Sequence, residues 1–535
     1  MTGYAARTRD RRGARPAARR ARTAGIVPAP SAALAASIAL AANIALAASI
    51  ALLAGCMVGP SYQKPPATAP AAFKEPPPAN WKSATPRDEL PHGRWWELFG
   101  DPQLNALEEQ VAVSNQSIAQ AEAQFRAARA AAAVARANLF PTVTAGASAS
   151  RSRGAASRGS TTGTGASGSP VTPVTPTGTT PSTTSFYQVP IDVSYELDVW
   201  GRIRRQIESS VATAQASAGD LETLRLSMQA ELAVDYFELH GLDAQKQLLD
   251  TTAGAYQKAL DLTNNRYHQG IASGVDVAQA QTQLETTRAQ AIDLGVQRTQ
   301  LEHAVAVLIG KAPSDLTISL APVGVQPPSI PVALPSELLE RRPDVAANER
   351  RMAAANAQIG VQVAAYYPTI SLTASGGYEN SKLADLFSWP SRFWSLGASA
   401  VETLFNGGAR RAATEQAKAN YDAAVAAYRQ NVLTAFQDVE DNLSALRVLD
   451  EEAAQQAVAV AAAERSLALS NYRYQGGITT YLEVITAQAA ALANERTAVD
   501  ILTRRMTASV NLVKGLGGGW RDSDLPSGAS ILSRR

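Results

Sequence analysis

The sequence predicts an α+β membrane protein in which long antiparallel coiled-coil helices are joined to short β-strands. Residues 409–475 contain neither proline nor glycine and are rich in Ala, Glu, Gln and Arg, which lose little on entering a helix. At 1.5 Å per residue, such a helix is roughly 100 Å long, too long for a small globular domain. Residues 186–197 and three other segments alternate apolar and polar side chains, the period expected of strands.

The long helix is predicted twice, because the chain repeats itself after 206 or 207 residues. The matching pairs include Glu196 and Glu402, Gly201 and Gly407, Arg266 and Arg473, Tyr267 and Tyr474, and Gly270 and Gly477. A repeat of this length indicates duplication of a half-domain. Within residues 409–475, larger apolar residues spaced by threes and fours indicate a coiled-coil seam.

Residues 1–55 have the pattern of a lipoprotein signal peptide. They hold eight arginines and one aspartate before an Ala/Leu/Ile run, whereas the rest of the chain has 41 basic and 46 acidic residues. Small residues stand directly before Cys56, the only cysteine, as in a bacterial lipobox whose cysteine becomes the lipidated N-terminus. Met57 follows instead of aspartate, which in such signals implies release to the outer membrane. A transmembrane anchor is the alternative.

The remaining elements follow in order. Residues 56–101 are a proline-rich tether, because clustered prolines forbid helix. The first half-repeat, 102–312, contains a helix to about residue 139, a strand hairpin over 142–197, a long helix over 202–267 and a return helix. A linker over 313–335 leads to the second half-repeat, 336–515, with a helix, a hairpin over 369–403, the long helix over 409–475 and its return helix. A tail over 516–535 ends the chain.

The first hairpin contains a low-complexity insertion over 151–185, rich in Ser, Thr, Gly and Pro. In all four strand segments one face is small and apolar, the other is polar, and aromatic residues stand at the ends, which is typical of membrane barrel strands. Soluble sandwiches alternate too. Four strands are too few to close a barrel that encloses a lumen, and the unpaired backbone groups of an open sheet edge cost free energy in lipid. If these strands lie in a membrane, the chain must therefore form a homo-oligomer.

Nothing in the sequence indicates an enzyme, a cofactor or a metal site. The four histidines, His92, His240, His268 and His303, lack metal-ligand spacing, and no hydrolase motif is present. A G-x-G-x-x-G match within residues 163–168 has neither the preceding strand nor the following helix that a nucleotide site needs. The mildly acidic chain after the leader also argues against a nucleic-acid partner.

The plan from Cys56 to Trp520 resembles the TolC-like outer-membrane efflux factors, in their lipoprotein, NodT-type branch serving RND multidrug pumps. The residues that carry the resemblance are the double repeat, Arg341-Arg342-Pro343-Asp344, Tyr367-Pro368-Thr369 and Leu516-Gly517-Gly518-Gly519-Trp520. The resemblance implies a homotrimer in the outer membrane of a Gram-negative bacterium. Three chains would share a 12-stranded barrel that continues as a helical tunnel into the periplasm.

As a function, the resemblance implies a passive exit duct for drugs or small molecules. The implied partners are a periplasmic adaptor protein, an inner-membrane RND pump and outer-membrane lipid. Two alternatives stay open: the outer-membrane duct of a type I protein secretion system, and a lipid-anchored coiled-coil scaffold without a pore. A scaffold without a pore does not require four strand segments that each have an apolar face, so these segments favour the duct.

The resemblance also implies a gate at the periplasmic tip. Tyr474 matches a tyrosine that ties the closed tip, Leu482 an apolar constriction and Glu483 an acidic ring position. Gln475 stands where some members have arginine, and Thr486 where members usually have a second aspartate, so an inner cation-binding ring is not expected. The tip turns, at which an adaptor would dock, contain Gly270, Gly274, Gly476 and Gly477. Gly270, Gly476 and Gly477 are expected to permit positive φ.

Overall fold

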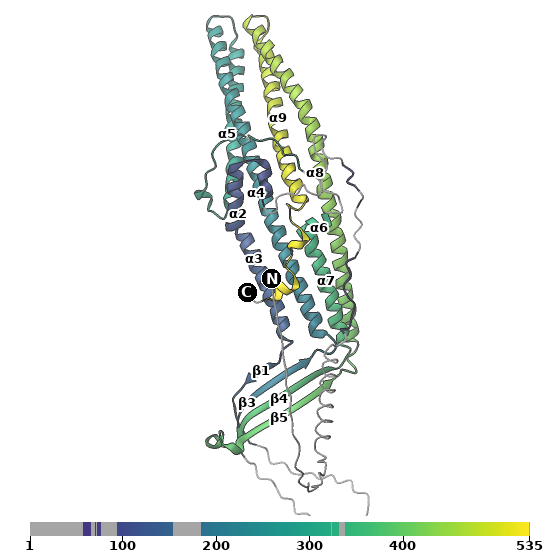
Figure 1. Cartoon of the computed structure of the whole chain (residues 1–535). Helices are drawn as coiled ribbons and strands as arrows, with labels where there is room; N and C mark the ends of the chain where they lie inside the picture. The colour runs from purple at the N-terminus through teal and green to yellow at the C-terminus, as the bar shows by residue number, and fades with distance from the viewer. Residues whose placement is uncertain are drawn as a thin grey trace, which may run out of the picture. The chain divides into compact units, whose positions relative to one another are not determined.

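The computed structural model describes residues 57–65, 70, 72–75, 94–153, 183–322, 324–330 and 338–533, all within one compact unit, Cys56–Arg535. The predicted signal over 1–55, Cys56 and most of the insertion over 151–185 lie outside the described residues. Within the unit, long helices continue at one end into a single antiparallel sheet (Figure 1). This arrangement confirms the predicted α+β class.

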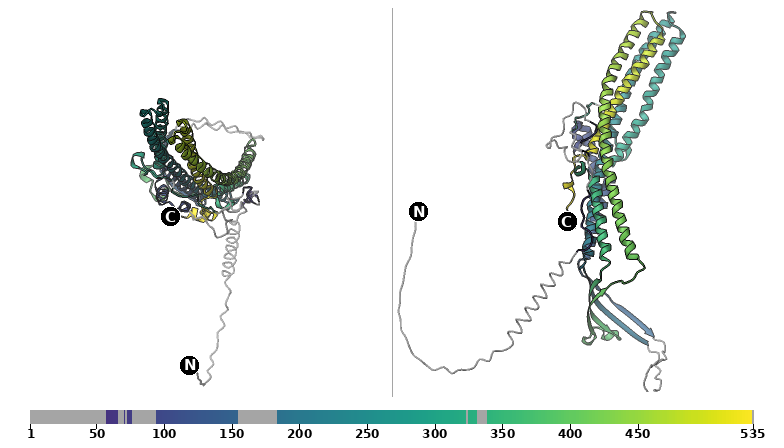
Figure 2. Two further views of the ribbon diagram at one scale, coloured as in Figure 1. Left: turned by 90° about the horizontal axis from the view of Figure 1, so that it is seen from above. Right: turned by 90° about the vertical axis from the view of Figure 1, so that its right-hand side faces the viewer.

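The sequence repeat is also a repeat of helix lengths. Helices α4 (Arg202–His268) and α8 (Ala409–Gln475) each contain 67 residues, and their return helices α5 (Gly274–Leu308) and α9 (Tyr481–Gly515) each contain 35. Each long helix packs along its own return helix, which gives two helical pairs. Viewed from above, the helices of the unit follow a curved line and not a closed bundle (Figure 2).

Shorter helices extend the two pairs toward the sheet. They are α2 (Pro102–Ser114), α3 (Gln116–Ala137), α6 (Leu338–Arg341) and α7 (Pro343–Ala364), with α10 (Gly528–Leu532) in the C-terminal tail. Single 3-10 turns lie at Trp95–Phe99, Pro313–Asp315, Leu383–Asp385, Trp389–Ser391 and Asp522–Asp524. The tail is therefore partly ordered: Ile531 of α10 packs with Ala132 of α3 and Ala214 of α4.

The prediction of one continuous helix from residue 102 to about 139 was wrong. The helix breaks at Asn115, whose Oδ1 accepts hydrogen bonds from the backbone N–H groups of Ser117 (2.9 Å) and Ile118 (3.0 Å). Its Nδ2 donates to the carbonyl oxygen of Leu308 at 2.8 Å, at the end of α5. Asn115 thus caps α3 and fixes α5 beside it, a tertiary role that the helical composition of the segment does not reveal.

The sheet has four strand positions in the order β1-β3-β4-β5. The strands are β1 (Thr142–Ala145), β2 (Ser148–Arg153), β3 (Thr183–Leu197), β4 (Thr369–Asn380) and β5 (Arg392–Val401). Strands β1 and β2 pair with β3 in one continuous register, so they act as one strand with a gap. The strands β2, β3 and β4 extend beyond the predicted segments, at the end away from the helices.

Pro190 explains the gap between β1 and β2. In this register Gly146 is its partner: the Gly146 N–H donates to the Pro190 carbonyl at 3.0 Å, but proline has no N–H to donate in return. On the other side Pro190 lies opposite Gly377 of β4. A Cβ on Gly377 would stand 2.1 Å from the carbonyl oxygen of Val189, so only glycine fits there.

The cross-strand register sorts the side chains onto two different faces, because directly opposed residues point to the same side. One face is mostly apolar and includes Val143, Ala145, Ile191, Val193, Leu372, Trp394 and Leu396. The other is mostly polar and includes Thr144, Asp192, Ser194, Ser371, Ser375 and Ser395. In a single copy Trp394 is 78 % and Leu396 76 % exposed, so the apolar face has no cover from the described part of the chain.

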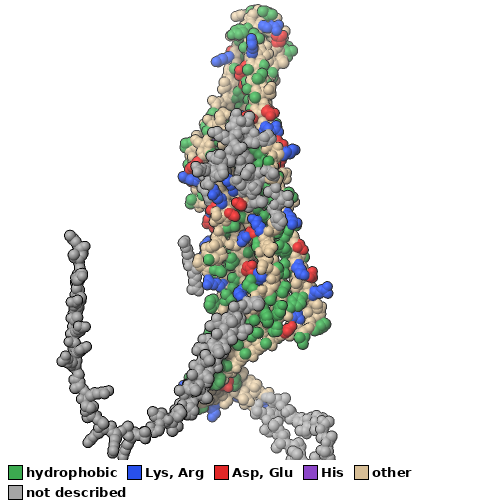
Figure 3. All heavy atoms as spheres, turned by 45° about the vertical axis from the view of Figure 1, so that its right-hand side comes forward, with side chains coloured by type: hydrophobic (Ala, Val, Ile, Leu, Met, Phe, Trp, Pro, Cys, Tyr) green, Lys and Arg blue, Asp and Glu red, His purple; other side chains and the backbone are tan. Residues whose placement is uncertain are grey.

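Along the helical part, Lys and Arg side chains are interspersed with Asp and Glu on the face drawn in Figure 3. In the described ranges, no helix is both long enough and apolar enough to cross a bilayer. Trp95, Trp96 and Phe99 are buried members of the main hydrophobic core.

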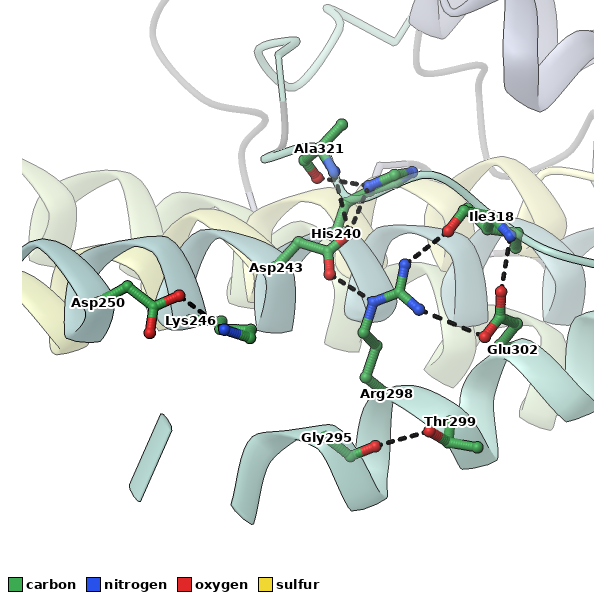
Figure 4. A network of polar contacts seen from close by, with 10 residues as sticks. All are labelled: His240, Asp243, Lys246, Asp250, Gly295, Arg298, Thr299, Glu302, Ile318 and Ala321. Carbon is green, nitrogen blue, oxygen red and sulfur yellow. Dashed lines mark hydrogen bonds and ion pairs between the residues drawn. The ribbon is translucent and has the colours of Figure 1, made fainter. Parts of the chain in front are cut away.

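A polar network fastens the linker between the half-repeats onto the first helical pair (Figure 4). Arg298 of α5 donates to Asp243 of α4 (Nε to Oδ1, 2.6 Å) and to the carbonyl oxygen of Ile318 (2.7 Å). The Nδ1 of His240 lies 2.6 Å from the carbonyl oxygen of Ala321, and the Ala321 N–H donates to Asp243 at 3.1 Å. Desolvation opposes the charge of Asp243, but its bonds to His240, Arg298 and Ala321 prevail and lower its pKa.

Candidate functional site at the helical tips

Two helical turns close the helical pairs at the end of the unit farthest from the sheet (Figure 1). Gly270 has φ 76° and Gly477 has φ 71°. In each turn the next residue, Ile271 or Ile478, donates its N–H to a carbonyl of the last helical turn, at 2.8 and 2.9 Å. Both turns are therefore Schellman motifs, in which glycine takes the left-handed position without strain.

The other two tip glycines do not have this role. Gly476 has φ −73°, a right-handed conformation, so the expectation that it needs positive φ was wrong. Gly274 is the first residue of α5, where Ser273 caps the helix through a reciprocal pair of bonds with Asp276. The internal repeat carries the signal that separates the two glycines, because it aligns Gly477 with Gly270 but Gly476 with Gln269.

Residues from both pairs share one hydrophobic cluster below the turns. Its buried members are Ala253, Tyr256, Leu260, Ala280 and Leu284 from the first pair, and Tyr474, Tyr481 and Val484 from the second. The rings of Tyr474 and Tyr481 lie 5.2 Å apart. Burial raises the pKa of Tyr481 to about 12, so its hydroxyl is neutral at physiological pH. The two pairs are thus held together near their tips by apolar packing.

Arg266 adds a polar bridge between the pairs. Its Nη1 donates to the carbonyl oxygen of Tyr474 at 2.7 Å, and its Cζ lies 4.6 Å from the centroid of the Tyr474 ring. The hydroxyl groups of Thr263 and Tyr474 are 3.4 Å apart. Arg266 was visible in the sequence as the repeat mate of Arg473, but the repeat gave no sign that only one of the two arginines reaches across to the other pair.

The remaining predicted gate residues occupy the exposed end of the second pair. Gln475 is the exposed last residue of α8. Glu483 forms an exposed ion pair with Arg473 (Oε2 to Nη1, 3.2 Å). Thr486 donates to the carbonyl oxygen of Leu482 in its own helix at 2.9 Å.

Leu482 is 58 % exposed and faces neighbouring side chains of α5 across a hollow of about 480 Å³. The hollow is lined by Gly274, Val275, Ala278, Gln279, Thr282, Gln283, Leu482 and Ile485. More than half of the Leu482 surface is thus open to solvent in a single chain. Its side chain is free to meet other copies of the chain.

A second, larger hollow of about 650 Å³ separates α4 from α8 and α9 beneath the tips. Its lining mixes apolar, hydroxyl and charged side chains, among them Thr252, Leu262, Tyr472, Asn471 and Glu495. Burial, and then the charge of Glu464, raise the pKa of Glu495. Neither hollow holds a nucleophile beside a base, and no metal-binding group of His, Cys, Asp or Glu occurs among the described residues.

Comparison with known proteins agrees with this geometry. The family model described as outer membrane efflux protein matches residues 107–311 and 334–518. The chain is 32 % identical to the probable efflux pump outer membrane protein TtgC of Pseudomonas putida, covering 87 % of this chain and 93 % of that protein. It is also 32 % identical to the outer membrane protein OprJ of Pseudomonas aeruginosa, with the same coverage.

Solved structures give the same result. The outer-membrane channel OprN is 32 % identical, with a TM-score of 0.77 over 87 % of this chain and all of that chain. The CmeC outer membrane channel of Campylobacter jejuni is 22 % identical, with a TM-score of 0.78 over 88 % of this chain and 96 % of that chain, which shows a shared fold.

Proposed function

The chain belongs to the outer membrane efflux protein family, and we propose that it is a passive exit duct gated at its helical tips. It is the outer-membrane channel of a tripartite efflux system and extends into the periplasm. Drugs or other small molecules pass through it from the periplasm to the exterior. It uses no cofactor and catalyses no reaction, and its lipid anchor is Cys56.

The observation that carries this proposal is the sheet with one apolar and one polar face. The apolar face is exposed in a single copy, as a lipid-facing wall must be, while the acidic residues Asp192, Glu196 and Glu379 share the polar face. Among the described strands, β1–β2 and β5 have no partner along their outer edges. A homotrimer joins these edges and gives twelve strand positions around a water-filled lumen.

The homotrimer is supported further by the segment that joins β5 to α8. Leu404 and Phe405 are 89 % and 87 % exposed in a single chain, and large apolar side chains rarely remain this exposed without a partner. We assign them to contacts between copies.

The gate is formed where three copies meet at the tips. Three Leu482 side chains converging on the axis form an apolar constriction, and three Glu483 carboxylates favour cations beside it. Thr486 is engaged with its own helix and adds no charge, so one acidic ring stands at the tip. A periplasmic adaptor docks at the turns around Gly270, Gly274, Gly476 and Gly477, and an inner-membrane RND pump supplies the energy.

Single-channel conductance in planar bilayers tests the duct and the gate together. The parent should give a small, cation-preferring current that rises in Leu482→Ser. Leu469→Ser is the matched control, because Leu469 is similarly exposed near the end of α8 but lies outside the hollow at Leu482. No current from folded protein would favour the scaffold, and a current unchanged by Leu482→Ser would place the constriction elsewhere.

A further inference from the structure

Three arginines stand at the outer end of the apolar face of the sheet. Arg151 and Arg153 belong to β2. In the shared register of β1 and β2 they lie on the same face of the sheet as Val143 and Ala145 of β1. Arg392 begins β5 and lies directly opposite Tyr378, which lies opposite Val189 on the same face. The outer end is the end of each strand that points away from the helices (Figure 1).

No carboxylate shares this face within the described strands. Asp192, Glu196 and Glu379 all alternate onto the polar face. The apolar face is therefore uncharged along its length and turns positive only at its outer end. A lumen-lining role does not explain these arginines, because the register directs them to the side that faces lipid.

The two sets of arginines stand on opposite edges of one chain's sheet. Strand β2 pairs only with β3 and strand β5 only with β4 among the described strands, so both outer edges are unpaired. Closing a barrel from several copies joins the β5 edge of one copy to the β1–β2 edge of the next. Arg392 of one copy then approaches Arg151 and Arg153 of its neighbour, and the cluster is complete only in the oligomer.

The loop between β4 and β5 holds Arg392 in place. The Ser391 hydroxyl donates to the carbonyl oxygen of Asp385 at 2.7 Å and accepts from Asn380 Nδ2 at 2.7 Å. This loop carries the exposed Trp389, and the Cζ of Arg392 lies 3.5 Å from the centroid of its ring. Tryptophan is typical of the boundary between the apolar core of a membrane and its headgroups, so the guanidinium is held at headgroup level.

We propose that Arg392 of one copy and Arg151 and Arg153 of the next bind the phosphate groups of an outer-leaflet lipid. Guanidinium groups bind phosphate oxygens in bidentate fashion, and the apolar face below the cluster receives the acyl chains of the same lipid. Charge complementarity and continuity with the membrane-facing surface both identify a phosphorylated lipid as the occupant. This inference rests on the proposed trimeric barrel.

The test measures binding of lipid A with two phosphates to the purified full-length trimer by native mass spectrometry. A basic residue near an anionic lipid surface contributes about 1 kcal/mol, roughly a fivefold factor. Replacing all three arginines with glutamine should therefore weaken binding on the order of a hundredfold. The matched control replaces the same three residues with lysine, which keeps the charge and should retain most of the binding. Phosphatase-treated lipid A should bind weakly to the parent.

Equal binding by the parent and the glutamine variant would overturn the proposal, and so would equal binding of phosphate-free lipid A. Complete displacement of the lipid by inorganic phosphate would identify a free-anion site instead. Conductance separates this inference from the proposed duct. A trimer that conducts but binds lipid A equally well with and without its phosphates refutes the lipid site alone. Failure of the parent to form a trimer refutes both. If the triple glutamine variant fails to assemble, the single variants Arg153→Gln and Arg392→Gln provide the test. Each should bind lipid A about fivefold more weakly than the parent.

Discussion

Replacing Arg266 with alanine should open the periplasmic tip. Arg266 is a polar link between the two helical pairs, through a 2.7 Å bond to the carbonyl of Tyr474 and its position 4.6 Å from that ring. A hydrogen bond from a charged donor contributes about 1.5–3 kcal/mol and a cation–π contact about 0.5–2 kcal/mol. Because Arg266 is only half-buried, we take the lower end, about 2 kcal/mol per copy, which corresponds to a roughly 30-fold shift toward separated pairs.

The structure offers a matched control for this experiment. Arg473 is the repeat mate of Arg266, but its partner Glu483 lies within the same helical pair and both side chains are exposed. Such surface pairs contribute about 0–1 kcal/mol. Arg473→Ala should therefore leave the tip closed.

The assay is single-channel conductance of purified trimers, with the open probability as the readout. Arg266→Ala should raise the open probability at least tenfold, and Arg266→Lys should give an intermediate value because it keeps the charge but not the planar donor. Equal open probabilities in the parent and Arg266→Ala would refute the reasoning. Equal increases in the Arg266 and Arg473 variants would also refute it, because separation of the pairs would then not be the opening step.

Three further predictions concern residues of the helices and of the sheet that lie away from the tips. Glu108 is fully buried, and its carboxyl group has no hydrogen-bond partner among the described residues. Burial raises its pKa well above the ordinary value, so the free energy of unfolding should fall as pH rises above the unfolded-state pKa. Glu108→Leu should abolish that fall and raise the free energy of unfolding by about 1–3 kcal/mol, seen in melts across pH. Gly377→Val should abolish trimers in size-exclusion chromatography because its side chain meets a neighbouring carbonyl, whereas Gly376→Ala, with ordinary contacts, should retain them. Arg298→Ala should cost about 3–5 kcal/mol in chemical unfolding by leaving Asp243 buried without its ion-pair partner, and a melt like that of the parent would contradict this.

The long helices could be predicted because their signal is local. Residues 409–475 form a run of 67 without proline or glycine, and the internal repeat extends the same prediction to residues 202–268, which lack proline. Strand alternation likewise predicted the two faces of the sheet. The break at Asn115 could not be predicted, because it depends on Leu308, which is 193 residues away in the chain. The gap between β1 and β2 could not be predicted either, because the register decides which neighbouring strand lacks a hydrogen bond from Pro190.

At the tips, the turn pattern predicted where the helices reverse but not which side chains join the pairs. Tyr474 was expected at the closed tip through resemblance alone, and its contacts with Arg266 and Thr263 come from the other half-repeat. Such contacts depend on how the two helical pairs pack against each other, and the spacing of apolar residues along one helix does not determine that packing.

The duplication makes the two halves alike in backbone and unlike in their contacts, and this difference determines how the tip can open. Both turns share the Schellman geometry, but only α5 begins with a side-chain capping box, at Ser273. Arg473 and Glu483 move together with the second pair, whereas Arg266 and Tyr474 belong to different pairs and must part when the pairs separate. We therefore expect opening to break the Arg266 bridge and to expose part of the shared tyrosine cluster, while each pair remains intact. On this basis we expect the tip to open by displacement of one pair relative to the other, against the Arg266 bridge, the Thr263–Tyr474 contact and the shared tyrosine cluster.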